Sequence, residues 1–224
     1  MIRLHVIAEG RTEQRFVADV LAEHLVQFDV YADARCVLTG RDKRRARAFR
    51  GGMTSYRRAK NDIETWMKED KDPKCFFTTM FDLYALPDDF PDFHLTRAER
   101  DPYERVCRLE SAFLKDMASP RFIPYIQMHE FEALIFSDLE KLALEYLGRQ
   151  SEIARLARTM TGENPELIDD SPNTAPSKRI LEIIPEYDKP TGGVLVVQRI
   201  GLPGLKQKCR HFNKWVEKLE ALAP

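Results

Sequence analysis

The sequence predicts an α/β fold, with a mainly parallel sheet flanked by helices and a helical C-terminal portion. The first observation is that apolar runs typical of strands alternate with amphipathic helical patterns over residues 1–136. Such alternation is typical of parallel strands joined by helical crossovers. The second is that strand patterns fade from Ser137 onward, where helical patterns dominate. We therefore expect an α/β core at 1–136 and a helical cover or subdomain at 137–224, packed together as one unit.

Four apolar segments are the predicted strands of the core. They are Ile2–Ala8, Ala34–Thr39, Lys74–Phe81 and Phe122–Met128. The third is apolar almost throughout, which is typical of a strand buried on both faces of a parallel sheet. Gly40 ends the second strand, and we expect a basic loop after it.

Helical periodicity predicts the remaining elements. In the core it predicts a helix over Thr12–Phe28 with Thr12 as N-cap, a second beginning after Ser55, and a third over Pro102–Met117. In the C-terminal portion it predicts helices over Leu139–Leu147, Ser151–Met160, Ser177–Ile184 and His211–Leu222.

Composition limits the class of protein. The chain has 224 residues, 43% hydrophobic and 32% charged, which suffices for a core with a solvated surface and excludes extensive disorder. The net charge of −1 says nothing for or against a polyanionic partner. The four cysteines are scattered, no secretory leader precedes them, and no apolar run approaches the roughly 20 residues that span a bilayer. We expect a soluble, cytoplasmic protein.

Two glutamates flank the turn after the first predicted strand. Glu9 follows the strand directly, and Glu13 lies in the first turn of the next helix, with Gly10 allowing a tight turn between them. Open α/β sheets usually build their sites at the carboxyl ends of strands. Either the two carboxylates hold a hard cation such as Mg²⁺, or Glu13 only complements the helix dipole and Glu9 is a solvated turn residue.

A second acidic strand end follows the third predicted strand. Asp82 comes directly after seven mostly apolar residues, where an unpaired carboxylate is costly and a cation would compensate. The alternative is that Asp82 caps the following turn through the backbone. Asp88 and Asp89 lie in a loop flanked by prolines, and for at least one of them solvated surface is the expectation.

A third acidic segment is His129-Glu130-Phe131-Glu132. If the strand continues, Glu130 and Glu132 share one face. If a helix has begun, only one of them reaches the site. No second histidine or cysteine is spaced for zinc, so we interpret His129 as a structural histidine.

Basic residues cluster between Arg41 and Lys60, with nine Lys or Arg against one acid. Such a cluster fits the phosphate backbone of a nucleic acid, and a solvated loop and helix face is the alternative. The residues that we predict to contact nucleic acid are Arg11, Arg41, Lys43, Arg44, Arg45, Arg47 and Arg50.

These segments together resemble the bacterial DUF4276 family (domain of unknown function 4276) over nearly the whole chain. The resemblance rests on the segments Val6–Glu13, Met80–Pro91, His129–Asp138, Asp170–Arg179 and a tail that includes Cys209–Trp215. That family is considered related to the Toprim fold of topoisomerases, primases and OLD-type nucleases, so the resemblance implies a Toprim-like core.

The Toprim pattern has a glutamate after the first strand and an Asp-x-Asp after a later one. Glu9 matches the glutamate and Asp82 the first Asp, but Tyr84 stands at the position of the second. The missing acid would have to come from Glu130, Glu132 or Asp88.

The resemblance also implies a lysine and a further acid. In OLD-type nucleases an acid four residues after the first glutamate also contributes to the site, and Glu13 stands at that position here. Lys178 corresponds to a catalytic lysine by its order along the chain, and an exposed lysine at a helix start is the alternative. The implied catalytic residues are then Glu9, Glu13, Asp82 and Lys178, and the implied metal ligands are Glu9, Glu13, Asp82, Glu130 and Glu132.

The function implied is a nuclease dependent on Mg²⁺ or Mn²⁺, acting on DNA or RNA, with DNA the favoured substrate, in bacterial defence or genome maintenance. The resemblance further implies an ABC- or OLD-type ATPase partner encoded nearby, and the sequence is compatible with a homo-oligomer. The alternative is a catalytically inert Toprim-like module that binds or regulates the ATPase, which the missing second Asp favours.

Overall fold

The fold is built on a parallel sheet. The computed structural model describes residues 1–42, 47–50, 53–160, 162, 164–168 and 175–223, and for 38–42 and 47–50 it describes the backbone alone. The strands of the main sheet are β1 (Ile2–Ala8), β2 (Val30–Cys36), β5 (Cys75–Asp82), β6 (Phe122–Ile123) and β7 (Ile126–Gln127). Every neighbouring pair is parallel, which confirms the predicted fold class.

The strand that follows β1 in the chain lies on one side of β1, and the later strands of the main sheet lie on its other side. The strand order is β2-β1-β5-β6, with β7 also pairing with β5. The register joins Ala8 of β1 to Cys36 on one side and to Met80 on the other. Because the strands are parallel, the residues that follow β1, β5 and β7 emerge at one edge. The position between β1 and β5 is the topological switch point at which open α/β sheets bind ligands.

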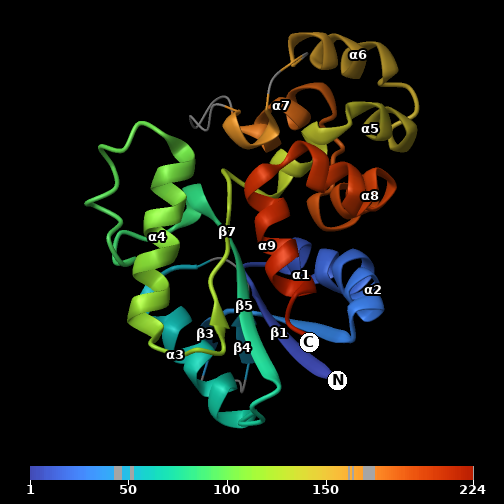
Figure 1. The fold of residues 1–224 in the computed structure, drawn as a ribbon. Helices are drawn as coiled ribbons and strands as arrows, with labels where there is room; N and C mark the ends of the chain where they lie inside the picture. The colour runs from blue at the N-terminus through green and yellow to red at the C-terminus, as the bar shows by residue number, and fades with distance from the viewer. Residues whose placement is uncertain (43–46, 51–52, 161, 163, 169–174, 224) are drawn as a thin grey trace.

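Helices cover both faces of the sheet (Figure 1). On one side lie α3 (Tyr56–Glu69) and α4 (Pro102–Met117), whose buried side chains pack with Phe77 and Phe81 of β5. On the other side lie α1 (Arg11–Phe16), α2 (Ala22–Leu25) and α9 (Arg210–Glu220). Trp215 of α9 also donates a hydrogen bond from Nε1 to Thr78 Oγ1 at 2.9 Å.

The remaining C-terminal helices gather at the end of the molecule toward which β7 runs (Figure 1). They are α5 (Leu139–Glu145), α6 (Gln150–Thr159), α7 (Pro176–Ile183) and α8 (Val194–Lys208). The hydrophobic cluster that contains Leu4 and Phe16 also contains Leu205 and Phe212, so it crosses the predicted boundary at residue 136. Within the described residues, no helix has the length and apolar character needed to cross a membrane.

Sequence patterns missed one helix of the C-terminal portion and one break in a strand of the core. They did not predict α8, in which Gly201 has φ 75° and Pro203 lies inside the helix. Both residues interrupt helical periodicity in a sequence. They also joined β6 and β7 into one strand over Phe122–Met128, whereas Pro124 lies between the two short strands. Proline has no N–H to donate to a neighbouring strand.

The basic segment after β2 differs from the predicted loop. We predicted one strand over Ala34–Thr39. In the structure β2 ends at Cys36, and a new strand, β3 (Leu38–Asp42), begins two residues later. β3 pairs with β4 (Arg47–Arg50) in a separate antiparallel hairpin. Pairing satisfies backbone groups that a loop would leave to water. Arg41, Arg47 and Arg50 therefore lie on strands, and Lys43, Arg44 and Arg45 lie outside the described residues.

Candidate metal centre

Glu9 and Asp82 meet at the switch point between β1 and β5. The backbone N–H of Glu9 donates to the carbonyl of Met80 at 3.1 Å, which extends the pairing of the two strands by one residue. The Glu9 side chain then crosses to β5, where its Oε2 accepts a hydrogen bond from the backbone N–H of Asp82 at 3.0 Å. Two residues that are 73 positions apart in the sequence are thus held next to each other.

Glu13 joins them through the turn that Gly10 makes. Glu13 is 6% exposed, and its Oε2 accepts a hydrogen bond from the Gly10 N–H at 2.8 Å. Gly10, rather than the predicted Thr12, is the N-cap of α1. A Cβ atom at position 10 would lie 3.2 Å from Glu13 Oε2, so a larger residue would crowd this carboxylate.

Glu130 and Glu132 reach the same edge from the segment after β7. His129 has φ 61° and Glu130 is extended, and a 3₁₀ helix begins at Phe131. Both glutamates are 1% exposed. The structure is intermediate between the two alternatives considered above, because Glu130 precedes the helix and Glu132 lies in its first turn.

One lysine contacts both of these glutamates. Lys189 Nζ lies 3.4 Å from Glu130 Oε2 and 3.1 Å from Glu132 Oε2. Burial would lower the pKa of Lys189, but Glu132 and Glu130 outweigh burial and raise it, so the ammonium is charged at neutral pH.

The shared position raises the pKa values of the carboxyl groups. Burial, followed by repulsion from Glu13, Glu9, Glu132 and Glu130, raises the pKa of Asp82 well above its usual value. Burial raises the pKa of Glu13 to about 7 and that of Glu132 to about 7, and it also raises that of Glu9. Burial and mutual repulsion therefore disfavour the charged carboxylates, and either protons or a cation can relieve this cost.

Asp82 has the least satisfied carboxylate. Its Oδ1 is buried and has no hydrogen-bond partner among the described residues. A buried oxygen without a partner costs free energy unless a ligand contacts it. Because the side chains that converge at this edge offer mainly carboxylate oxygens, the group that fits best is a hard divalent cation such as Mg²⁺ or Mn²⁺.

The spacing of the oxygens says how such an ion would be bound. In the part of the chain that the structure describes, only His5, Asp70 and Cys75 bring three ligand atoms within 4.8 Å of one another. The carboxylates at the strand ends are spread more widely. An ion there would keep part of its water shell, as Mg²⁺ usually does in proteins.

The tighter His5 group is a structural network. Arg3 donates to Asp70 from Nε at 3.0 Å and from Nη2 at 2.8 Å, so a guanidinium already neutralises that carboxylate. Burial raises the pKa of the Cys75 thiol to about 12, so the thiol is protonated in the protein without a metal. We interpret the group as a network that ties these segments together.

The other predicted site residues lie on the surface or serve structure. Lys178 is exposed in the first turn of α7, one residue after Ser177, whose N–H donates to Glu130 Oε1. Arg11 is exposed at the first residue of α1, two positions from Glu9. Asp88 is exposed and pairs with Arg97 at 2.9 Å, so it does not supply the missing acid.

Sequence reasoning missed Lys189 and Tyr187. The hydroxyl of Tyr187 donates to Glu132 Oε1 at 3.4 Å. The available signal was the Gly192-Gly193 pair that follows Lys189-Pro190, because paired glycines often mark a close approach of the backbone to other groups. A Cβ atom at Gly193 would lie 2.4 Å from the Tyr187 hydroxyl oxygen.

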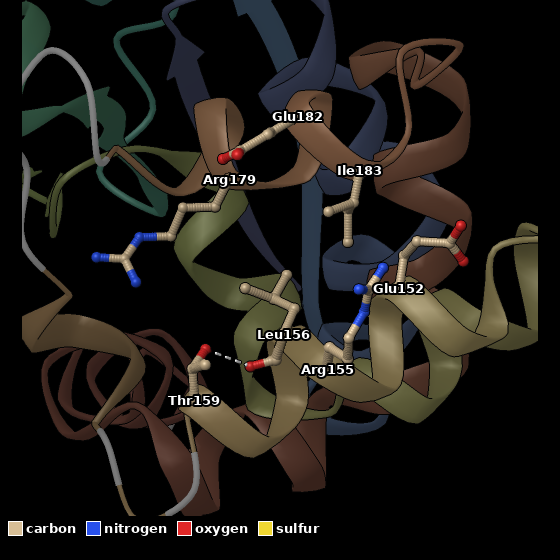
Figure 2. A pocket seen from close by; sticks show the side chains of 7 residues that line it. All are labelled: Glu152, Arg155, Leu156, Thr159, Arg179, Glu182 and Ile183. Atoms are coloured by element: carbon tan, nitrogen blue, oxygen red, sulfur yellow. Dashed lines mark hydrogen bonds between the residues drawn. The ribbon is translucent and has the colours of Figure 1, made fainter.

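A separate pocket lies between α6 and α7 (Figure 2). It has a volume of about 560 Å³ and contains none of the five carboxylates described above. Its lining residues are Glu152, Arg155, Leu156, Thr159, Arg179, Glu182 and Ile183. The guanidinium groups are accompanied by equally many carboxylates, so the lining does not favour a ligand of one charge.

Comparison with known protein families identifies the chain. The model of the domain of unknown function DUF4276 matches residues 8–220. The chain belongs to the DUF4276 family. The matched region of this DUF4276 protein includes all five carboxylates and Lys189. A comparison with curated proteins found no match, and neither did a comparison with solved structures.

Proposed function

We propose that this DUF4276 protein is a Mg²⁺- or Mn²⁺-dependent nuclease that hydrolyses phosphodiester bonds. The observation that supports the proposal is the convergence of Glu9, Glu13 and Asp82 at the switch point of a parallel sheet, with Asp82 Oδ1 buried and unpaired. The resemblance of these acids to the Toprim pattern motivates the choice of phosphodiester chemistry.

In this proposal the five acids form two groups with different tasks. Glu9, Glu13 and Asp82 hold the cation, and the backbone bonds from Asp82 and Gly10 orient Glu9 and Glu13. The bound ion would activate water and stabilise the charge that builds on the phosphate. Glu130 and Glu132 support the centre from its other side. Lys178 is exposed, so it would act only by reaching the substrate from the surface.

The basic residues would bind the nucleic acid by its backbone. Arg11 lies at the edge where the acids converge, and the β3–β4 hairpin supplies Arg41, Arg47 and Arg50. Lys43, Arg44 and Arg45 complete the predicted contact set. Phosphate contacts give weak sequence preference and affinity that falls steeply with salt. Preference for DNA, a role in defence or genome maintenance, and an ABC- or OLD-type ATPase partner belong to the same proposal.

The test is cleavage of plasmid and single-stranded substrates by purified protein with Mg²⁺, Mn²⁺ or EDTA, alone and with an ATPase encoded nearby. We expect Glu9→Gln and Asp82→Asn to lower the metal-dependent rate by at least about 100-fold. Asp88→Asn is the matched control, because Asp88 is an exposed acid in the loop that follows Asp82. Cleavage that persists in EDTA, or that neither substitution changes, would contradict the proposal.

The second candidate function is an inert module that regulates an ATPase. Tyr84, half exposed, occupies the position at which the Toprim pattern has its second Asp. This candidate predicts that the protein binds its ATPase equally well with and without Asp82→Asn, and that no cleavage occurs in the complex. Metal-dependent cleavage that Asp82→Asn abolishes would exclude it.

A further inference from the structure

Lys189 is held in place by its own turn and by α1. It begins a π-helical turn, η6 (Lys189–Gly193), whose Thr191 N–H donates to Asp188 Oδ2 at 3.1 Å. Arg15 of α1 donates from Nη1 to the Pro190 carbonyl at 3.3 Å. The backbone on both sides of Lys189 is therefore held, and its partly exposed side chain places the ammonium against both carboxylates.

The carboxylates at this edge fall into two groups by their partners. Glu130 accepts from the Ser177 N–H and from Lys189, and Glu132 from the Tyr187 hydroxyl and from Lys189. One ammonium is therefore shared by both carboxylates, and each carboxylate also accepts a hydrogen bond. Asp82, by contrast, has a buried oxygen without a partner and no lysine or arginine within ion-pair distance among the described residues.

We propose that Lys189 takes the place of a second metal ion, so that the centre binds one divalent cation at Glu9, Glu13 and Asp82. An ammonium shared by Glu130 and Glu132 supplies the positive charge that a second ion would otherwise bring. A second ion would have to displace it or lie close to it, and two positive centres repel each other. The inference rests on the proposed metal dependence and adds its stoichiometry.

The inference assigns Lys189 a role as a positioning residue. It holds Glu130 and Glu132 away from the ion and keeps them from acting as ligands. Removing the ammonium leaves both buried carboxylates without a cation, and two such carboxylates form a new site for a hard ion. The number of ions bound per chain is therefore the quantity that Lys189 controls.

The experiment counts Mn²⁺ ions per chain by calorimetric titration and by native mass spectrometry. We expect one ion in the natural protein, one in Lys189→Arg, which keeps the charge, and two in Lys189→Ala. Lys208→Ala is the control, because Lys208 is an exposed lysine of α8 without a role in the centre, and this variant should bind one ion. Lys189→Met keeps the aliphatic stem and replaces the alanine variant if that variant fails to fold.

The outcomes separate this inference from the proposed function. Two ions in the natural protein, or one ion in both Lys189→Ala and Lys189→Met, would overturn the role of Lys189 while leaving metal dependence intact. No ion in the natural protein would overturn the metal centre itself. A rise from one ion to two on loss of Lys189 alone would support the inference, since a merely structural lysine would not add a metal site.

Discussion

At the scale of single residues, Asp82 combines a buried strand end with an unpaired charge. Its neighbours on β5 are almost all buried, and its own Oδ1 is buried without a partner among the described residues. The nearby glutamates disfavour its charged form, which is why the pKa of Asp82 is raised. A residue that destabilises the empty protein at such a position is typical of a functional site.

We therefore expect Asp82→Asn to stabilise the protein in the absence of divalent ions. Asparagine removes a charge from a crowded carboxylate group, and we expect the free energy of unfolding in EDTA to rise by about 1 kcal/mol. Urea denaturation at pH 7 measures this change. Asp88→Asn should stay within about 0.5 kcal/mol of the natural protein, as surface substitutions usually do. A lower stability for Asp82→Asn than for Asp88→Asn would be evidence against electrostatic crowding.

At the scale of elements, helix ends depend on side chains far away in the sequence. Ser55 precedes α3 as predicted, but its own side chain does not cap the helix. Asp89 does so instead, because its carboxylate accepts hydrogen bonds from the N–H of Tyr56 at 2.8 Å and from the Ser55 hydroxyl at 2.8 Å. Asp89 thus fixes the start of α3 against the loop that follows β5.

Asp89→Ala is expected to lower the free energy of unfolding by about 1 kcal/mol at pH 7, the usual effect of removing a helix cap. Asp88→Ala, one residue earlier, should change it by less than about 0.5 kcal/mol. Burial would raise the pKa of Asp89, but the hydrogen bonds from Tyr56, Ser55 and Arg57 outweigh it and lower the pKa.

This shift fixes the sign of the pH dependence. A carboxyl group whose pKa is lower in the folded protein stabilises it above the unfolded pKa, near 4, and the stabilisation is lost as pH falls through the folded pKa. The difference between the natural protein and Asp89→Ala should therefore shrink between pH 5 and pH 2, as followed by urea denaturation. An equal or larger difference at low pH would show that Asp89 does not act as a charged cap.

At the scale of the whole molecule, one hydrophobic cluster joins the first strand to the last helix. Leu4 of β1 and Phe16 of α1 are buried with Leu205 of α8 and Phe212 of α9. The C-terminal helices thus cover a face of the sheet that would otherwise be exposed to water. The predicted division at residue 136 stays a prediction. The shared cluster means that residues 1–136 and 137–224 bury apolar side chains against each other.

A fragment of residues 1–136 is therefore expected not to fold cooperatively. It would expose the apolar face that α8 and α9 cover and lose the hydrogen bond from Trp215 to Thr78. Burial of apolar surface is the main favourable term in folding, at roughly 25 cal/mol per Å². Thermal unfolding followed by circular dichroism measures the effect, with the full chain as control. A sharp transition in the fragment would show that the core is independent.

Local signals in the sequence sufficed for much of the core. The bounds of β1 at Ile2–Ala8 and of α4 at Pro102–Met117 match the predicted ones, because apolar periodicity and a proline at the helix start act over short distances. The position of Glu9 and Asp82 at strand ends follows from the same signals. The β3–β4 hairpin and α8 were missed, because charge, glycine and proline hide the periodicity there.

The sequence by itself determined the class of fold, the parallel strands and the acids that end them, since each depends on residues close together in the chain. Only the tertiary structure decided that β1 lies between β2 and β5, and that Lys189 pairs with Glu130 across 59 positions. The physical reason is that strand order and ion pairing depend on how distant segments pack. Local periodicity carries no information about which charged side chains from distant segments will form an ion pair.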